Sequence, residues 1–166
     1  MRKTAQKEIK DFINNHTWAT LCTVSAEGNP YAIEFNYFLL DGYICGLIKP
    51  NGTTAKNIAV NQNICLKMCR TDESSREFTP LESGVKAPSF LTGFTAASVF
   101  GKGEFVHDED GVIKGWDLLE DRLKLPKGTY EKFKEKFIKK KNKYPMFRMK
   151  PEKMTGITTT AVTSNK

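Results

Sequence analysis

The chain has 166 residues, of which 39% are hydrophobic, 27% are charged and 11% are aromatic, and its formal net charge is +7. This composition excludes a disordered or collagen-like chain, and the length predicts one globular domain over residues 1–166 that buries about 70% of its unfolded surface. No apolar run approaches the roughly 18 residues of a membrane-spanning helix, and the first ten residues lack the apolar stretch of a signal peptide. We therefore expect a cytoplasmic protein with no membrane partner.

The excess positive charge lies in one segment. Lys132–Lys143 holds seven lysines and one Glu, whereas residues 1–107 hold 11 basic and 10 acidic side chains. Arginine, which reads bases and phosphates better than lysine does, is absent from this segment. We interpret the segment as the solvated face of a helix and expect no nucleic-acid partner. A polyanion site is the alternative, and steeply salt-dependent binding would distinguish it.

The four cysteines stand at positions 22, 45, 65 and 69. In an extended stretch Cys65 and Cys69 are separated by about 13 Å, beyond the roughly 7 Å limit between the Cα atoms of a disulfide. No close pair of Cys or His residues completes a zinc set, and both histidines stand alone in the sequence. We expect buried, reduced thiols and no metal.

The first part of the chain predicts one helix and then strands. Helical spacing of apolar residues predicts a short amphipathic helix over Lys3–Asn15. Thr17–Ser25 and Pro30–Leu40 are rich in β-branched and aromatic residues and flank the turn cluster Ala26–Asn29, which predicts a hairpin. After the Asp41-Gly42 turn signal, Tyr43–Ile48 is predicted to be a third strand, in which Gly46 leaves room for a close approach to the backbone.

The remaining elements alternate between helices and strands. Thr54–Val60 is predicted to be a short helix and Asn63–Cys69 a strand, while Thr71–Thr92 lacks a sustained period and predicts a long surface loop. The further expected elements are a strand at Thr95–Val106, a helix at Asp110–Leu125, a second helix that Thr129 can cap, and a last strand at Met146–Thr160. Because the early strands are joined by turns too short for crossovers, this order favours a mainly β, antiparallel barrel with peripheral helices.

The segment Gly52–Lys56 carries the most suggestive chemistry. Free amides at a helix N-terminus, two hydroxyls and one ammonium group can converge on a phosphate. The segment matches neither the phosphate loop of nucleotide hydrolases nor a dinucleotide-binding glycine motif. Taken alone, it is equally consistent with a capped helix that carries a surface lysine.

Neighbouring segments add a family resemblance. The chain resembles the FMN-binding split barrels of the pyridoxamine 5′-phosphate oxidase-like superfamily over residues 5–157, in segments that follow the family order: Gly28–Tyr37, Asp41–Ile48, Thr53–Ile58, Asn63–Met68, Ser98–Val106 and Met146–Gly156. The resemblance implies a six-stranded antiparallel split β-barrel that forms a homodimer, with FMN held between two subunits. It is nearest in character to the nitroimidazole-reductase-like and flavin-reductase-like branches.

The resemblance also implies the cofactor-binding residues. Phe35, Asn36 and Tyr37 would line the isoalloxazine, largely through backbone groups, although core packing is an equal alternative for the two aromatic side chains. Beside the ring and ribityl chain would lie Gly46, Leu47 and Ile48. The phosphate would be held by Thr53, Thr54 and Lys56. For the interface, the candidates are apolar residues of the fifth and last strands, each of which could equally belong to the core of one subunit: Val99, Phe100, Phe105, Met146, Phe147 and Met149.

Three departures argue against oxidation of the vitamin phosphate itself. Lys56 follows Ala55, where the vitamin oxidases have adjacent basic residues, and Ala96 stands where relatives often have Ser or Gln. No histidine follows His107, so the oxidases' substrate-binding Arg-x-His segment is missing. Relatives in the shorter branches often use a His near the second strand, where this chain offers Glu34 or Asn36.

The functional expectation is an FMN-dependent oxidoreductase that acts on a small-molecule substrate, with reduced nicotinamide as a possible electron donor. The flavin would carry the electrons while the protein sets orientation, potential and access. No catalytic acid or base is identified, and Glu34 is more easily read as an outward charge than as a proton donor. The alternative is a carrier or sensor without turnover, and deazaflavin or haem remain possible in place of FMN.

Overall fold

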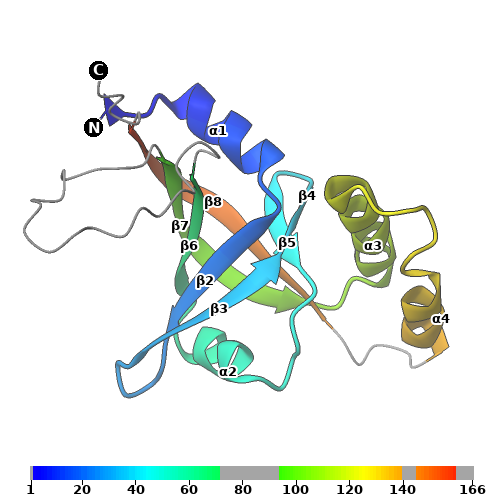
Figure 1. Ribbon diagram of the computed structural model, residues 1–166. Helices are drawn as coiled ribbons and strands as arrows, with labels where there is room; N and C mark the ends of the chain where they lie inside the picture. The colour runs from blue at the N-terminus through cyan, green and yellow to red at the C-terminus, as the bar shows by residue number, and fades with distance from the viewer. Residues whose placement is uncertain (1, 72–93, 140–144, 160–166) are drawn as a thin grey trace, which may run out of the picture.

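The strands of this protein form one antiparallel sheet that curls into a barrel (Figure 1). The computed structural model describes residues 2–71, 94–139 and 145–159. Within these ranges the sheet has eight strands: β1 (Arg2–Lys3), β2 (Trp18–Val24), β3 (Pro30–Asn36), β4 (Phe38–Leu40), β5 (Tyr43–Gly46), β6 (Asn63–Thr71), β7 (Phe94–Val106) and β8 (Met146–Thr159). The predicted loop Thr71–Thr92 lies almost entirely outside the described residues.

The order of the strands explains why the barrel is split. Hydrogen-bonded neighbours follow the order β3-β2-β6-β7-β8-β5-β4, with β1 paired to β8 off this path. The two ends of the path, β3 and β4, are consecutive in the chain and separated only by Tyr37. Strand β3 pairs with β2, and β4 pairs with β5. The two ends of the sheet are therefore joined at Tyr37 by the chain and not by hydrogen bonds between strands, and this is where the barrel is split.

The expectation of six strands was wrong in number, although the split-barrel fold is confirmed. The path has seven strands because Pro30–Leu40, expected as one strand, divides at Tyr37 into β3 and β4. Its first half pairs with β2 and its second half with β5, so the strand must bend between two partners. The eighth strand, β1, has two residues, too few to predict from sequence pattern.

The two predicted turns are confirmed. The β2–β3 hairpin closes at the turn that contains Gly28, whose φ is +85°, and the β4–β5 hairpin closes at Asp41 and Gly42, whose φ angles are +50° and +80°. Residues with positive φ at both central positions twist in the sense that matches the flanking strands. The Asp41-Gly42 pair therefore fixes the β4–β5 register.

Four helices surround the barrel within the described ranges: α1 (Gln6–Asn15), α2 (Thr53–Val60), α3 (Glu109–Leu123) and α4 (Glu131–Lys139). Helix α1 lies across one end of the barrel and α2 across the other, while α3 lies beside β4 and α4 lies farther out (Figure 1). In the part of the chain that is described, no helix is both long and apolar enough to cross a membrane.

Two apolar clusters hold the elements together. The larger fills the barrel, where alternate residues of β2 such as Ala19 and Leu21 point inward and meet Ile9 of α1 and Ile58 of α2. The smaller lies outside the barrel, between α3 and the outer sides of β4, β5 and the start of β8; its buried members are Phe38, Cys45, Val112, Leu119 and Met146. The buried members that β2, β6 and β7 contribute to the larger cluster stand on their inward faces: Ala19, Leu21, Ile64, Leu66, Met68, Ala97 and Val99.

The residues that could have formed an interface mostly belong to the core. Five of the six candidates are buried or pack against the two clusters: Val99, Phe105, Met146, Phe147 and Met149. Phe100 differs, because it stands on the outer face of β7 and is 40% exposed. Alternation along a strand separates the two faces, but the sequence does not say which face is inside.

The expected cap of the second C-terminal helix is also corrected. Thr129 donates its hydroxyl to the carbonyl of Pro126, one turn earlier, and α4 begins only at Glu131. The predicted lysine face is exposed in α4 except for Lys134, which is 8% exposed and pairs with Asp117 of α3. The end of the basic segment, residues 140–143, lies outside the described ranges.

One glycine in the longest strand pair has a strong structural requirement. The β7–β8 register shifts between Phe100 and Gly101. A Cβ atom on Gly101 would lie 2.2 Å from the carbonyl oxygen of Lys150, which belongs to the backbone of β8. A side chain at this position therefore requires the two strands to move apart.

We expect Gly101→Ala to lower the free energy of unfolding by about 1–3 kcal/mol or more, as overpacking against an immobile group does. Urea denaturation measures the change. Gly52→Ala is the control, because its Cβ would lie 3.5 Å from the nearest atom, the carbonyl oxygen of Lys49, which is ordinary contact. An unfolding midpoint for Gly101→Ala equal to that of the unmodified protein would contradict the prediction.

Candidate functional site

The ends of β3 and β5 approach each other at the point where the barrel is split. A Cβ atom on Gly46 would lie 2.6 Å from Cε2 of Phe35 and 3.6 Å from the carbonyl oxygen of Asn36. These strands are not paired with each other, since β5 pairs with β4 and β8. We call this contact of Phe35 and Asn36 with Gly46 the β3–β5 seam.

Backbone groups are available along one edge of β3. This strand is the end of the sheet path, with β2 on one side and no strand partner among the described residues on the other. An unpaired strand edge presents N–H and C=O groups that a ligand can use. The seam therefore has hydrogen-bonding capacity in the backbone.

The side chains predicted to line a flavin ring are largely occupied within the fold. Phe35 is 8% exposed and lies edge-on to Phe147 in the barrel core, with ring centroids 5.9 Å apart. Asn36 donates its side-chain amide to the carbonyl of Thr17 at 3.2 Å. Only the backbone of these residues is left for a ring, which is the role that the resemblance implied and which stays a prediction.

Tyr37 is fully buried and has a structural role. Its hydroxyl donates to the carbonyl of Ile13 at 2.6 Å, and the Arg122 guanidinium lies 4.4 Å from the centre of its ring. Burial raises the pKa of Tyr37 to about 12, although the charge of Arg122 acts in the opposite direction. The phenol therefore stays protonated at neutral pH and joins the barrel to α1.

Gly46 is the last residue of β5, and Leu47 and Ile48 begin the connection from β5 to α2. Gly46 is buried, and the space beside it that the sequence left open is filled by the ring of Phe35. Leu47 packs against the outer cluster and Ile48 against the barrel core, so neighbouring side chains point to opposite sides. This alternation leaves the backbone of the connection between the two clusters.

The N-terminus of α2 has the features of an anion site. Gly52 precedes the helix in an extended conformation, and no side chain caps the helix there. The first N–H groups of a helix lack partners within it and carry partial positive charge. Thr53 and Lys56 are exposed, whereas Thr54 is 3% exposed and its side chain faces the fold. The structure thus places two of the three predicted phosphate side chains at the surface.

Asn57 is a residue of this region that the sequence reasoning did not single out. It is 4% exposed, and its side-chain amide donates to the hydroxyl oxygen of Thr23 on β2 at 3.0 Å. The hydroxyl of Thr23 in turn donates to the carbonyl of Tyr31 on β3 at 3.4 Å. This chain of hydrogen bonds fixes α2 against the hairpin. The signal was present in the sequence, since Asn57 lies within the family-like segment Thr53–Ile58.

We expect Asn57→Ala to lower the free energy of unfolding by about 1–3 kcal/mol, because a buried hydroxyl loses its hydrogen-bond donor. Thermal or urea denaturation measures this loss. The exposed Asn51, in the connection before α2, supplies the control Asn51→Ala, which should change stability by less than about 0.5 kcal/mol. Equal effects of the two substitutions would show that the bond to Thr23 does not stabilise the fold.

No acid–base pair or metal cluster marks this region. Glu34 is exposed and accepts a hydrogen bond from Thr20 at 2.5 Å, as expected for an outward-facing charge. No group of three or more potential metal ligands occurs among the described residues. The four cysteines are unpaired, but only Cys45 is buried, since Cys22 and Cys65 are half-buried and Cys69 is exposed, contrary to the expectation of buried thiols. Burial raises the pKa values of Cys22 and Cys65, which face each other across β2 and β6.

Together, the split antiparallel barrel, the unpaired edge of β3 and the uncapped α2 define a split-barrel protein. The sequence profile described as Pyridoxamine 5'-phosphate oxidase matches residues 5–157. The chain belongs to this family. No curated protein sequence matches the chain significantly.

Solved structures with this fold come from several bacteria. A candidate 5-nitroimidazole antibiotic resistance protein from Bacteroides thetaiotaomicron has a TM-score of 0.67 at 17% identity, covering 93% of this chain and 85% of that one. An FAD-binding protein from Mesorhizobium loti has a TM-score of 0.67 at 13% identity, covering 96% and 98%. A haem storage protein from Vibrio cholerae has a TM-score of 0.58 at 18% identity, covering 95% and 96%.

Proposed function

We propose that this protein is a cytoplasmic, FMN-dependent oxidoreductase that acts on a small molecule and holds its flavin at a homodimer interface. The observation that carries the proposal is the position of the uncapped N-terminus of α2, which packs on β2 and β3 and follows the connection that begins at the β3–β5 seam. The family supports the proposal, since its solved relatives include flavin-binding proteins.

The phosphate end fits the residues present. Backbone N–H groups at the start of α2, the hydroxyl of Thr53 and the ammonium group of Lys56 offer donors to a phosphate. Asn57 keeps this helix end in place through Thr23. Because the side chain of Thr54 is buried, this residue would contribute its backbone N–H rather than its hydroxyl.

The ring end fits through backbone groups. Phe35 and Tyr37 are held in the core, so the edge of β3 and the connection after Gly46 would orient the isoalloxazine. When bound, a flavin accepts a hydride from a reduced donor and passes the electrons to a second substrate. The part played by this chain is to bind the cofactor, orient it and limit the access of water.

The outer face of the sheet favours a homodimer. A row across the strands runs from Cys22 on β2 to Cys65 on β6, Phe100 on β7 and Lys153 on β8. Trp18, on the same side of β2 as Cys22, is 51% exposed, and Phe100 is 40% exposed. An uncovered face with exposed aromatic side chains commonly marks a contact between proteins. A second copy of the chain is the partner that we propose for it.

We expect the purified protein to bind one FMN per subunit. FMN at about 100 times its dissociation constant should then stabilise the fold by about 2.7 kcal/mol, measured as a shift of the melting curve. The absorption spectrum gives an independent readout, because oxidised flavin and haem absorb at different wavelengths. A colourless protein whose melting curve FMN does not shift would rule out the proposed cofactor, and a Soret band would identify a haem protein instead.

Turnover separates the enzyme from a carrier. With FMN bound and oxygen removed, an enzyme that uses reduced nicotinamide should bleach the flavin absorbance and restore it when an acceptor substrate is added. A carrier or sensor would leave the flavin oxidised over the same period. Equal bleaching of free FMN in the absence of the protein is the background to subtract.

A further inference from the structure

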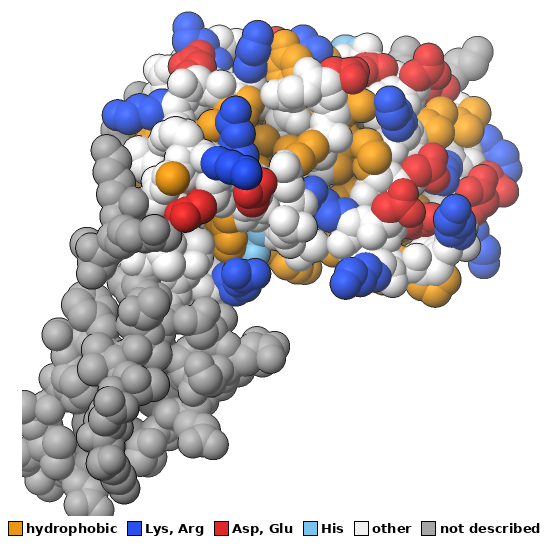
Figure 2. Space-filling model, turned by 90° about the horizontal axis from the view of Figure 1, so that it is seen from above, with side chains coloured by type: hydrophobic (Ala, Val, Ile, Leu, Met, Phe, Trp, Pro, Cys, Tyr) orange, Lys and Arg blue, Asp and Glu red, His pale blue; other side chains and the backbone are white. Residues whose placement is uncertain are grey.

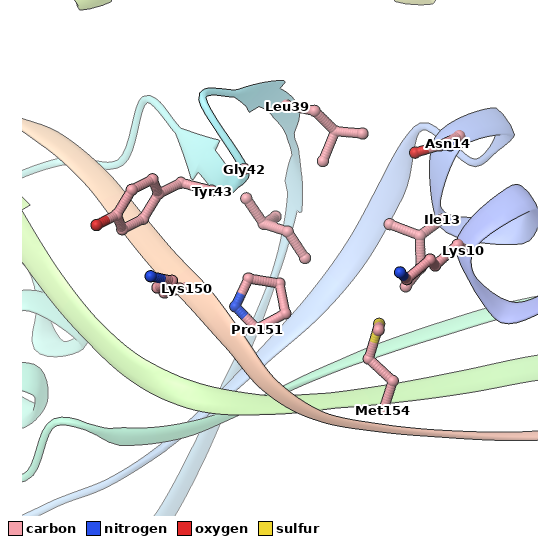
Figure 3. Close-up of a pocket in the computed structure, with 10 residues that line it drawn as sticks. Lys10, Ile13, Asn14, Leu39, Gly42, Tyr43, Lys150, Pro151 and Met154 are labelled. Carbon is pink, nitrogen blue, oxygen red and sulfur yellow. The ribbon is translucent and has the colours of Figure 1, made fainter. Parts of the chain in front are cut away.

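A cavity of about 400 Å³ lies between α1, the turn that joins β4 to β5, and β8 (Figure 3). The β4–β5 turn that lines it contains Gly42, which comes directly before β5, whereas Gly46 is the last residue of that strand. Ile44 lines the cavity about 7 Å along β5 from Gly46, but none of the residues proposed to hold the flavin is among the lining residues. The cavity is therefore not part of the proposed flavin site.

The floor of the cavity is apolar. Ile13 and Ile44 line it and are 5% and 1% exposed, as members of the barrel core. Leu39 and Met154 pack against the same core but are only partly buried, because they border the cavity. The fold thus leaves four apolar side chains from four separate elements, α1, β4, β5 and β8, around one hollow.

One wall of the cavity is held rigid. The ring of Tyr43 lies beneath the guanidinium of Arg148, which is 4.8 Å from the ring centre. Nε of Arg148 donates to Oε1 of Glu104 at 2.7 Å. A wall fixed by a neighbouring ion pair costs a ligand little ordering on binding.

The charged groups that line the cavity are both positive. Lys10 of α1 and Lys150 of β8 line it from opposite sides, and no Asp or Glu is among the lining residues (Figure 3). Neither lysine takes part in an ion pair in the described part of the chain. Seen from above, hydrophobic side chains gather in the middle of the molecule with charged side chains around them (Figure 2).

We propose that this cavity binds a small molecule with an apolar body and one terminal anionic group. Cavities of 300–1,000 Å³ with apolar walls and a few convergent polar groups are typical small-molecule sites. The apolar body would displace water from the floor, while Lys10 and Lys150 attract the anionic end. The proposal is independent of flavin binding.

The experiment compares three ligands with one chain length and different head groups: octanoate, octanol and octylammonium. The methyl resonance of Met154, identified among the five methionines by Met154→Leu, reports binding at this cavity in ¹³C-methyl NMR. We expect octanoate to shift this resonance at the lowest concentration and octylammonium at the highest. Comparable binding of all three ligands, or no shift with octanoate below its micelle-forming concentration, would overturn the proposal.

Matched variants locate the anionic end. Lys10→Gln and Lys150→Gln should each weaken octanoate binding about two- to fivefold, as the loss of one solvent-exposed charge contact does, and leave octanol unaffected. Lys7→Gln on α1 and Lys153→Gln on β8 are exposed controls outside the cavity and should have no effect. If the controls weaken octanoate as much as the cavity variants do, general surface charge is responsible and the proposal fails.

Filling the cavity gives a test that does not depend on charge. Asn14 lines the cavity from the exposed side of α1, so Asn14→Phe should occupy the space without burying a polar group. We expect this variant to keep its circular dichroism spectrum and its FMN affinity and to lose octanoate binding. Unchanged octanoate affinity in the folded variant would show that the ligand binds elsewhere.

Discussion

Replacing Lys56 with alanine should weaken the binding of FMN about 10- to 150-fold and leave the binding of riboflavin nearly unchanged. The two ligands differ only in the phosphate, and a hydrogen bond to a charged group contributes about 1.5–3 kcal/mol. Lys56 is exposed in the first turn of α2, beside the helix N–H groups that lack a side-chain cap. Its loss should therefore act on the phosphate and hardly on the fold.

Flavin fluorescence titration measures both affinities. Lys114→Ala, an exposed lysine of α3, is the matched control and should leave both ligands unaffected. Equal losses of FMN and riboflavin affinity in Lys56→Ala would mean that Lys56 supports the fold, and no loss of either would mean that the phosphate lies elsewhere.

The sequence predicted the type of nearly every element and an antiparallel barrel, because turn residues are local signals, whereas the split barrel was implied by the family resemblance. Asp41-Gly42 marked the β4–β5 turn, and the β-branched residues of Thr17–Ser25 marked β2 as a strand. The division of Pro30–Leu40 at Tyr37 had no such signal. It results from pairing with two strands, β2 and β5, which are brought together only by the complete barrel.

The candidate site was predicted by segment and less well by side chain. The family-like order placed the end of β3, the end of β5 and the start of α2 near one another, and the contact between Gly46 and Asn36 agrees with that order. Whether an aromatic residue faces a ligand or the core depends on the closing of the barrel. Phe35 points inward and contacts Phe147, which belongs to β8 and lies more than 100 residues away in the chain. No local sequence pattern predicts that contact.

Local sequence also does not show which face of a strand points inward, and this is why only Phe100 of the six interface candidates is left exposed on the outer face of the sheet. Val99 and Phe100 are adjacent and both apolar, but pairing of β7 with β6 and β8 turns Val99 into the barrel and leaves Phe100 outside. Opposite Phe100 on β6 stands Cys65, and opposite Cys65 on β2 stands Cys22. The outer face is thus partly apolar around Phe100. A substitution at Phe100 can therefore test whether a partner covers this face.

Phe100→Asp should weaken the proposed homodimer about 30- to 700-fold. Central aromatic residues of an interface typically contribute about 2–4 kcal/mol, and burying the new carboxylate at the interface is costly even with Lys153 opposite it on β8. Because Phe100 is 40% exposed in one subunit, the folded monomer should tolerate the change. Light scattering over a dilution series measures the dimer, and circular dichroism verifies the fold.

If the second subunit completes the flavin site, Phe100→Asp should also release FMN, with the same midpoint on dilution as the dissociation of subunits. Ile138→Asp is the control, since Ile138 is 47% exposed on α4, away from the sheet face, and receives the same charge. It should keep both the dimer and the flavin. A Phe100→Asp monomer that retains FMN at micromolar concentration would place the whole flavin site within one subunit, and an unchanged dimer would place the interface on another face.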